Sequence, residues 1–453
     1  MVPARTVTDR VVHSTWERPV ASPSSMPVSA DVVVIGGGII GISTAWFLAR
    51  QGVNVVVCEK GHVAGEQSGR NWGWVRQQGR DTRELPMAMA ANRIWRTLED
   101  DIGERVGFRQ GGCLFVARKE AELGAFEDWV QIAREHGLDT ELIGRHRLAE
   151  LVRGGGIDWP GAMYTASDAR AEPHKAAPAV ARAVERAGGA VLTGCAVRGL
   201  DLEAGRVAGV VTEHGRIRAA AVLCAGGAWT SMFCRSVGVA LPQLRVRGTV
   251  VRTAPGPDIL DGTLFDERIG IRRRDDGGYT IAPGMLLDHA LTPASFRWFA
   301  KFLPALKMDW RMLRLSFGRE FFDELRAPRR WSLDAPSPFE ATRVLDPAPN
   351  PKAVAVLRRD LATVFPALAD VAFVETWAGI IESTPDVIPA IGETHIPGFH
   401  VATGFSGHGF GIGPGAGMAI AGLLTGHDTG IDLEPLRLGR FFDGTPMTPQ
   451  SSI

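Results

Sequence analysis

The chain has 453 residues, enough for two to three domain-sized units with a large buried core. Its 50 basic and 50 acidic residues balance, with no basic stripe or acidic tail, which argues against a nucleic-acid partner. The five cysteines show no C-x-x-C spacing, so they indicate neither a disulfide framework nor a metal site, and they suit a reducing, cytoplasmic location.

Residues 1–29 are polar and rich in proline and serine, and they lack the apolar core of a signal peptide. We expect a flexible N-terminal arm without an export role. Truncating it should leave the fold intact.

The most informative stretch begins at Asp31. Residues 32–35 are apolar and β-branched, which predicts a short buried strand. Gly36, Gly38 and Gly41 then match G-x-G-x-x-G, and helix-forming residues continue to Arg50. The first glycine permits a tight turn, the second lets the backbone approach a pyrophosphate, and the third lets the helix pack on the sheet. The pattern predicts a dinucleotide site at the helix N-terminus, where the macrodipole favours negative charge.

The residues that follow favour the same interpretation. Gly52 ends the helix, residues 53–58 predict a second strand, and Glu59 stands 18 residues after Gly41, where a carboxylate can bind ribose hydroxyls. The alternative is a transmembrane span, because residues 32–49 carry no charge. The glycines and the immediate second strand argue against it.

Residues 61–75 predict a loop of Gly, Ser, Asn and Trp that could pass close to a large planar ligand, although an ordinary surface loop remains the alternative. Helices are expected at 88–98, 120–135, 147–152 and 176–187, and strands at 190–192, 206–212, 216–219 and 221–224. Residues 225–229 form a second glycine turn at a strand end, where ligands of open α/β sheets bind.

The second half begins with a strand-rich region at 245–281, which includes a hairpin turning at Asp276-Gly277. Residues 295–325 are helix-forming, aromatic and basic, and residues 326–350 are proline-rich and irregular. Glycines return at 377–392. A strand at 399–402, a third glycine-rich loop at 403–417 and an apolar helix at 418–424 follow.

Three glycine-rich turns far apart in sequence suit a long cofactor such as FAD. The chain resembles the D-amino-acid oxidase/sarcosine oxidase (DAO) family of FAD-dependent amine oxidoreductases over about 31–426. The resemblance lies in the first fingerprint with Glu59, in residues 68–73, 225–229 and 377–379, and above all in 384–392 and 402–409.

The resemblance implies an α/β (α+β) fold with two domains. A discontinuous Rossmann-like FAD-binding domain of glutathione-reductase type would comprise 30–85, 160–238 and 376–430. A substrate domain with a mixed sheet would comprise 86–159 and 239–375, with a helical insert at about 295–325, and residues 431–453 would form a C-terminal tail.

The family match also implies which residues contact FAD. They are Gly36, Gly38, Ile39, Ile40, Gly41, Glu59, Lys60, Ser68, Gly69, Arg70, Asn71, Trp72, Gly73, Val197, Ala225, Gly226, Trp229, Gly379, Gly404, Phe405, Gly407, His408 and Gly409. Relatives with a covalent flavin use a His or a Cys where this chain has Gly73 and Gly379, so we predict non-covalent FAD.

Four residues are candidates for the reaction itself. Arg272 and Arg274 are two apart on an expected strand, so both could project from one face and bind a substrate carboxylate, although a solvated basic edge is the alternative. Arg274 matches the family's Pro-Arg-x-Asp-Gly hairpin, with Arg273 in place of the proline. His408 could contact flavin or substrate or be structural, and Trp377, with Trp72 and Trp74, could wall the pocket or belong to the core. Arg70 and Arg76 are further carboxylate candidates.

The implied reaction is oxidation of the C–N bond of a small amino acid or secondary amine by hydride transfer to flavin N5, followed by hydrolysis of the imine. Three alternatives stay open: oxidation of a 2-hydroxy acid, an FAD-carrying subunit of a larger oxidase, and, least favoured, an NAD-only dehydrogenase. Expected partners are the substrate and an electron acceptor, either oxygen or a quinone. The insert at 295–325 could cover the site, form a homo-oligomer contact or rest on a membrane, and its mixed charges make the membrane the less favoured interpretation.

Overall fold

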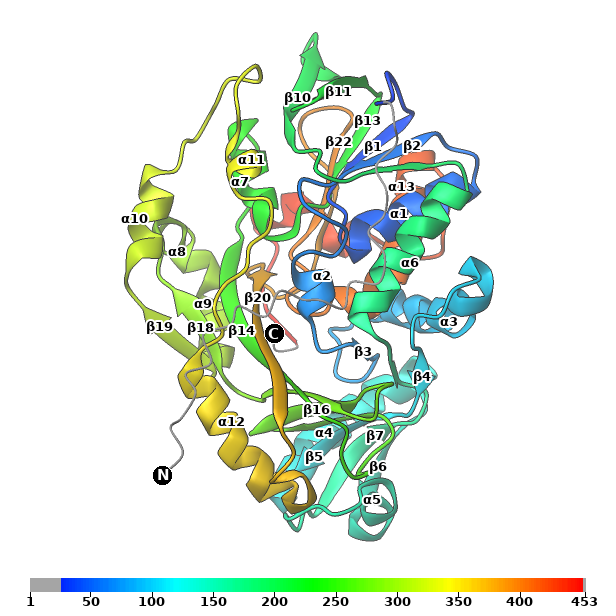
Figure 1. The fold of residues 1–453 in the computed structure, drawn as a ribbon, viewed down its shortest axis with the longest axis vertical. Helices are drawn as coiled ribbons and strands as arrows, with labels where there is room; N and C mark the ends of the chain where they lie inside the picture. Colours follow the sequence, from blue (N-terminus) through cyan, green and yellow to red (C-terminus); the bar gives the residue numbers. More distant parts are fainter. Residues whose placement is uncertain (1–25, 451–453) are drawn as a thin grey trace, which may run out of the picture.

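The computed structural model describes residues 26–450. Most of the expected N-terminal arm lies outside this range. Of its last residues, Ser29 forms a β-bridge with Arg218. Two large sheets with their helices make up the molecule (Figure 1).

The first sheet has six strands in the order β21 (Ala390–Glu393), β22 (Phe399–Thr403), β13 (Ala221–Cys224), β1 (Val32–Ile35), β2 (Val55–Cys58) and β9 (Ala190–Leu192). All neighbours are parallel except β21 and β22. The strands are short and valine-rich because both faces of a parallel sheet are buried. The expected strands at 190–192 and 221–224 have the predicted bounds.

Three helices pack against this sheet, α1 (Ile39–Arg50), α6 (Pro173–Arg186) and α13 (Gly409–Thr425), and α3 (Leu85–Ile102) packs on α13. The third glycine-rich stretch was predicted to be a loop up to residue 417, and this is wrong, because α13 already begins at Gly409. Its glycines allow close packing. A Cβ on Gly413 would lie 2.7 Å from Ile39 Cγ1, and one on Gly417 would lie 2.5 Å from Ser43 Cβ. The apolar faces of α1 and α13 therefore meet directly.

The second sheet has ten strands. Nine follow the order β19 (Leu313–Ser316), β18 (Leu287–Ala290), β14 (Leu244–Thr253), β17 (Tyr279–Pro283), β16 (Ile269–Arg273), β15 (Thr263–Asp266), β5 (Cys113–Ala117), β7 (Gly161–Thr165) and β6 (Thr140–Gly144), and β20 (Phe373–Ser383) also pairs with β14. The predicted hairpin joins β16 to β17. The long β14–β20 pair has no counterpart in the sequence predictions.

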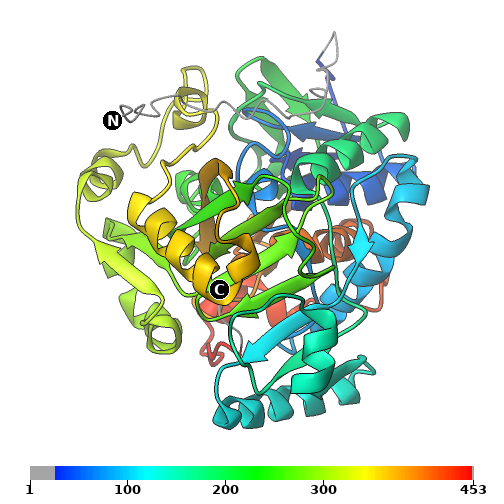
Figure 2. The same ribbon diagram turned by 60° about the horizontal axis from the view of Figure 1, so that its bottom comes forward.

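Other elements pack around this sheet. Helix α12 (Pro351–Val364) lies across β14, β16 and β17, as Figure 2 shows, and α4 (Glu120–Glu135) packs on β5, β6 and β7 beside α5 (Arg145–Leu151). Two three-stranded sheets complete the fold: β10 (Val197–Glu203), β11 (Arg206–Thr212) and β12 (Gly215–Arg218), and β3 (Trp74–Val75), β8 (Ala169–Arg170) and β4 (Arg109–Gln110). Short helices are α2 (Gln67–Arg70), η1 (Gly227–Trp229), α7 (Thr230–Ser236), α11 (Pro338–Ala341), η2 (Pro366–Leu368), η3 (Glu434–Leu436) and η4 (Leu438–Phe441).

The insert at 295–325 was expected to be helical throughout, and this is partly wrong. It contains α8 (Pro293–Arg297), α9 (Phe299–Asp309) and α10 (Arg319–Arg326), but β19 lies between the last two and extends the large sheet beyond β18. Edge pairing with β18 overrides the local helix preference of these residues. Across residues 26–450, no helix is both long and apolar enough to span a membrane.

The sheets and helices depart from the segments proposed as domains in three places. Strand β7, at 161–165, belongs to the ten-stranded sheet although it falls inside the segment 160–238, and β20 crosses the proposed boundary at 376. Helix α3 lies almost entirely in the segment 86–159 but packs on α13, which falls within the proposed FAD-binding segment 376–430.

Candidate functional site

A pocket opens at the carboxyl ends of β1, β2 and β13, and it encloses about 1230 Å³ of empty space, including open solvent at its mouth. Gly38, Gly226 and Gly407, one from each glycine-rich turn, all line it. The prediction that three remote turns converge on one site is therefore confirmed. A pocket that joins the ends of several strands of an α/β sheet with distant segments is typical of a dinucleotide site.

Backbone contacts explain the first fingerprint. Gly36 has φ +110°, and a Cβ there would lie 2.5 Å from the carbonyl oxygen of Ala225. A Cβ on Gly41 would lie 2.1 Å from the carbonyl oxygen of Gly36. Gly38 caps α1 without a side-chain hydrogen bond, and Ser68 Oγ accepts from the N–H of Ile39 at 2.9 Å. The turn thus brings the N-terminus of α1 to the pocket wall, where its N–H groups can face an anion.

Glu59 lies at the end of β2 and lines the same pocket. Its carboxylate accepts hydrogen bonds from the N–H groups of Gly37 and Gly61, each at 2.7 Å. Burial raises the pKa of Glu59, and these two N–H donors oppose the rise. The residue therefore holds the glycine turn in shape as well as facing the pocket.

A second polar group at the pocket wall involves Lys60, Glu66 and Trp229. Lys60 Nζ and Trp229 Nε1 each donate to Glu66 Oε1 at 2.9 Å, and Lys60 lies 4.2 Å from the centre of the Trp229 ring. Lys60 also donates to the carbonyl oxygens of Thr342 and Arg343. These bonds attach residues 339–344 to the pocket, where Phe339, Arg343 and Val344 line the wall. The sequence predictions missed this segment, because its irregular backbone has no periodic pattern.

Fifteen of the residues expected to contact FAD line the pocket: Gly36, Gly38, Ile39, Ile40, Glu59, Lys60, Ser68, Asn71, Val197, Ala225, Gly226, Trp229, Phe405, Gly407 and Gly409. Eight others do not: Gly41, Gly69, Arg70, Trp72, Gly73, Gly379, Gly404 and His408. Several of these glycines allow close packing behind the wall. For example, a Cβ on Gly404 would lie 2.2 Å from Thr384 Cγ2, and one on Gly379 would lie 2.3 Å from Gln67 Oε1.

These residues fit FAD. The pocket offers the N-terminal regions of α1 and α13, a carboxylate at the end of β2, and apolar walls from Phe405 and Phe410. Gln67 Oε1 is buried at the wall without a hydrogen-bond partner among the described residues, so it remains available to a bound group. The prediction that FAD is held non-covalently stays a prediction, with Gly73 and Gly379 offering no side chain for attachment.

Arg272 does not play the expected role of a substrate anchor. Its side chain is fully buried, and Nη1 and Nη2 donate to the two carboxylate oxygens of Glu172 at 2.8 and 2.9 Å. Burial alone would raise the pKa of Glu172, but the charge and hydrogen bonds of Arg272 hold it well below its usual range. The guanidinium also donates to the carbonyl oxygen of Trp72. Arg272 therefore joins the sheet to the loop at 71–75 as a structural ion pair.

Arg274 and Trp377 are also engaged within the protein. Arg274 lies 3.7 Å from Glu172 and 3.4 Å from Asp276, and its Nη1 donates to Thr280 Oγ1 at 3.1 Å. Trp377 Nε1 donates to the carbonyl oxygen of Arg70 at 2.8 Å. Neither residue lines the pocket. The expectation that Trp377 walls the site stays a prediction, and its packing in a small core cluster with Trp72 favours the alternative of a core residue.

His408 lies behind the pocket wall. Its Nδ1 is 2.9 Å from Glu84 Oε1, and both side chains are buried. Burial and the charge of Arg80 lower the pKa of His408, while Glu84 opposes this effect. The expected contact of His408 with flavin or substrate stays a prediction, and the position favours the structural alternative. The residue instead ties the turn before α13 to the start of α3.

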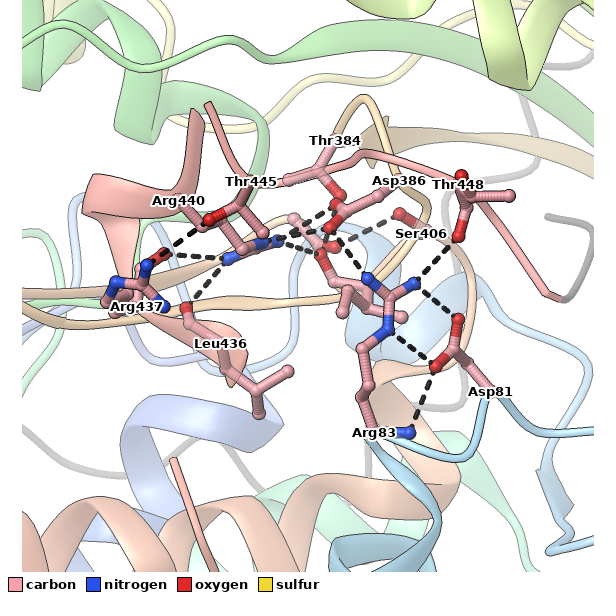
Figure 3. Close-up of polar contacts among 12 residues, drawn as sticks. Asp81, Arg83, Thr384, Asp386, Ser406, Leu436, Arg437, Arg440, Thr445 and Thr448 are labelled. Atoms are coloured by element: carbon pink, nitrogen blue, oxygen red, sulfur yellow. Dashed lines mark hydrogen bonds and ion pairs between the residues drawn. The ribbon is translucent and has the colours of Figure 1, made fainter. Parts of the chain in front are cut away.

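The Thr384-Pro-Asp386 motif is held from behind by the C-terminal segment (Figure 3). Arg440 donates to both carboxylate oxygens of Asp386 at 2.9 Å, and also to the carbonyl oxygens of Leu436 and Ile388. Thr384 Oγ1 donates to the carbonyl oxygen of Ile388 at 2.6 Å. Residues 434–441 are therefore part of the packed structure, whereas the sequence predicted only a tail.

Glu382 is expected to make FAD retention pH-dependent. Its carboxyl lines the pocket beside Glu66 and Arg245, and burial raises its pKa to about 7, with Glu66 adding to the rise and Arg245 opposing it. Below pH 7 the folded protein therefore holds this group neutral, and above pH 7 it adds a negative charge to the pocket that would hold the anionic FAD. We expect the Kd for FAD to rise about tenfold between pH 6.5 and 8.5 in the wild-type protein.

Fluorescence titration of apoprotein with FAD across this pH range checks the expectation. Glu382→Gln cannot ionise, so its Kd should stay flat and match the wild-type value at low pH. An equal rise of Kd in the variant would show that another group is responsible.

Comparison with known proteins places this geometry in context. The family model described as "DAO: FAD dependent oxidoreductase" matches residues 31–423. The fold is similar to L-amino acid deaminase from Proteus myxofaciens, solved in complex with anthranilate, with a TM-score of 0.90 and 31% identity over 94% of this chain and 96% of that one.

Two curated proteins extend the comparison. Mitochondrial sarcosine dehydrogenase from Mus musculus is 26% identical over 409 residues, which cover 87% of this chain but 40% of that protein. Sarcosine oxidase subunit beta from Rhodobacter capsulatus is 24% identical over 420 residues, which cover 91% of this chain and 88% of that protein. The chain thus spans less than half the length of the sarcosine dehydrogenases that it matches.

Proposed function

Because this chain belongs to the DAO family of FAD-dependent oxidoreductases, whose model matches residues 31–423, we propose that it oxidises the C–N bond of a small amino acid or secondary amine. The observation that carries the proposal is the convergence of Gly38, Gly226 and Gly407 on one pocket together with Glu59. When bound, FAD supplies the two-electron acceptor for the C–H bond next to nitrogen. The chain's own residues bind, orient and shield the reactants.

The α-carboxylate of an amino-acid substrate needs a cation that the protein has not already neutralised. Arg76 suits this role better than Arg272 or Arg274. It forms no ion pair with a carboxylate of residues 26–450, its Nη1 donates to the carbonyl oxygen of Gln78 at 2.6 Å, and its guanidinium lies over Phe115. Burial lowers the pKa of Arg76, and the nearby carboxylates of Asp168 and Glu84 compensate only in part for the lost solvation of its charge.

Arg76 also lies near the proposed flavin site. A Cβ on Gly411 would lie 3.5 Å from the backbone nitrogen of Arg76. The backbone at Arg76 therefore lies beside the first turn of α13. Gly409 and Phe410 of that turn line the pocket. A carboxylate bound to Arg76 would therefore hold an amino acid beside the same helix end.

We expect Arg76→Met to raise the KM for amino-acid substrates about 10- to 100-fold, the value of one or two charge-assisted hydrogen bonds. FAD content and oxidation of an amine without a carboxylate should change little. Steady-state kinetics with a matched substrate pair checks this. Arg274→Met is the control and should leave KM unchanged. If Arg274→Met raises KM and Arg76→Met does not, the hairpin arginine is the anchor.

The proposed activity is tested by anaerobic mixing of the holoprotein with a panel of sarcosine, proline, D- and L-amino acids and 2-hydroxyglutarate. Loss of flavin absorbance with an amine and not with the hydroxy acid would support the proposal. Bleaching by 2-hydroxyglutarate alone would contradict it.

A second candidate function is that of an FAD-carrying subunit in a larger oxidase. The match to sarcosine oxidase subunit beta over 88% of that protein favours it. In that case the isolated chain should bind FAD, yet no member of the panel should bleach it.

A further inference from the structure

Residues 293–330, which comprise the insert at 295–325 and its flanks, present an apolar surface to solvent. Among residues 26–450, fourteen large hydrophobic side chains are exposed, and nine of them lie within 296–325: Phe296, Phe299, Leu303, Met308, Trp310, Leu315, Phe317, Phe322 and Leu325. Figures 1 and 2 place α8, α9 and α10 at one margin of the molecule, away from the six-stranded sheet. Such a concentration marks an interaction surface, because exposed apolar residues are normally scattered.

Helix α9 shows that this exposure follows a pattern. Phe299 and Leu303 of α9 and its C-cap residue Trp310, which keeps helical backbone angles, are spaced i, i+4 and i+11, which places them on one face, and they are 56%, 36% and 60% exposed. The buried residues of α9 are Ala305 and Asp309, which lie on a different face. The helix therefore turns its larger apolar side chains outward.

A cluster of aromatic rings extends the surface beyond α9. The ring of Phe317 lies 4.9 Å from that of Phe321 and 5.9 Å from that of Phe322, and Phe296 lies 6.1 Å from Phe321. These contacts join α8, the end of β19 and α10. Helix α10 has no buried residue, so most of its apolar side is covered by nothing in the described chain.

The charged residues around this apolar surface indicate which kind of partner it can bind. Residues 293–330 contain nine Lys or Arg and four Asp or Glu, although the whole chain has 50 of each. Lys307, Arg311 and Arg314 are exposed. Of the acidic residues, Asp309 is buried and Glu324 is half-buried, which leaves Glu320 and Asp323 exposed. Aromatic and leucine side chains bordered by Lys and Arg are typical of segments that lie in the interface of an anionic bilayer. Two copies of the surface would instead bring like charges together.

We propose that the insert at 293–330 is a docking surface for an anionic lipid bilayer. Phe299, Leu303 and Trp310 of α9, with Phe296 and Phe317, enter the interfacial layer, and the surrounding Lys and Arg side chains face lipid phosphates. The proposed contact is confined to the interfacial layer, because α9 is short and carries Lys301 and Lys307. It is independent of the proposed oxidation, because none of these residues lines the FAD pocket.

Co-sedimentation of the full-length holoprotein with vesicles tests the proposal. We expect binding to vesicles of phosphatidylcholine with 30–40% phosphatidylglycerol to exceed binding to pure phosphatidylcholine at least tenfold, and to fall between 0.1 and 0.5 M salt. The triple variant Phe299→Ser/Leu303→Ser/Trp310→Ser should lose at least tenfold in vesicle affinity while keeping its FAD content.

Two control variants test whether the bound partner is an anionic bilayer. Leu202→Ser/Val374→Ser/Leu423→Ser removes three exposed apolar residues outside the insert and should bind vesicles as the wild type does. Lys307→Glu/Arg311→Glu should abolish the preference for phosphatidylglycerol. Equal binding of the α9 triple variant and the wild type, or no preference for anionic lipid, would overturn the proposal. The proposal would also be overturned if the wild-type protein formed a dimer and did not bind vesicles, and if the triple variant were a monomer. That result would assign the surface to contact with a second copy of the chain.

Discussion

Replacement of Asp386 by asparagine should lower the free energy of unfolding by about 3–5 kcal/mol. The guanidinium of Arg440 is 1% exposed and pairs with both carboxylate oxygens of Asp386, so the variant leaves a buried charge without its partner. Arg83 lies 3.4 Å from the same carboxylate and loses a second interaction (Figure 3). Urea denaturation followed by circular dichroism measures the change.

Arg437 is the matched control for this prediction. It lies three residues before Arg440 and pairs with Asp443 and Glu434, but it is about one-third exposed. Solvent-exposed pairs of this kind contribute little, so Arg437→Ala should cost no more than about 1 kcal/mol. If Asp386→Asn costs as little as Arg437→Ala, the C-terminal segment does not hold the Thr384-Pro-Asp386 motif in the way described.

Replacement of Gly41 by alanine should weaken FAD binding about 100-fold or more, corresponding to ~2.7 kcal/mol. Its Cβ would lie 2.1 Å from the carbonyl oxygen of Gly36, and both atoms belong to backbone that cannot rotate away. Helix α1 must therefore shift from β1, and its N-terminal N–H groups move relative to the pocket. The flavin absorbance of the purified protein and FAD titration of the apoprotein check the effect.

Gly124 provides the matched control. It lies within α4, and a Cβ there would meet nothing within 4 Å. Gly124→Ala should therefore stabilise the protein by about 0.5–1 kcal/mol through helix propensity and leave FAD binding unchanged. Normal flavin content in Gly41→Ala would mean that α1 does not form the phosphate-facing wall.

Local sequence patterns predicted several elements in different parts of the fold. The strands at 190–192, 206–212 and 221–224 and the helix at 120–135 have the predicted bounds, because alternation and helical periodicity report burial directly. The family resemblance and the α/β fold are confirmed by the family match and by the similar deaminase structure. The start of α13 was missed by nine residues, since its glycines contradict helix propensity and are explained only by the close packing against α1.

The sequence by itself determined that three glycine turns exist, that Glu59 follows the second strand, and that the chain resembles FAD-dependent amine oxidoreductases. Only the tertiary structure decided which charged side chains are free. Arg272 and His408 looked like reactive groups in sequence. In the structure Arg272 pairs with Glu172, 100 positions away, and His408 lies against Glu84, 324 positions away. Ion pairs between distant segments depend on how the sheets and helices pack, and the spacing of residues along the chain does not reveal this packing. For the same reason the outward-facing side of α9 became visible only when the fold left it uncovered.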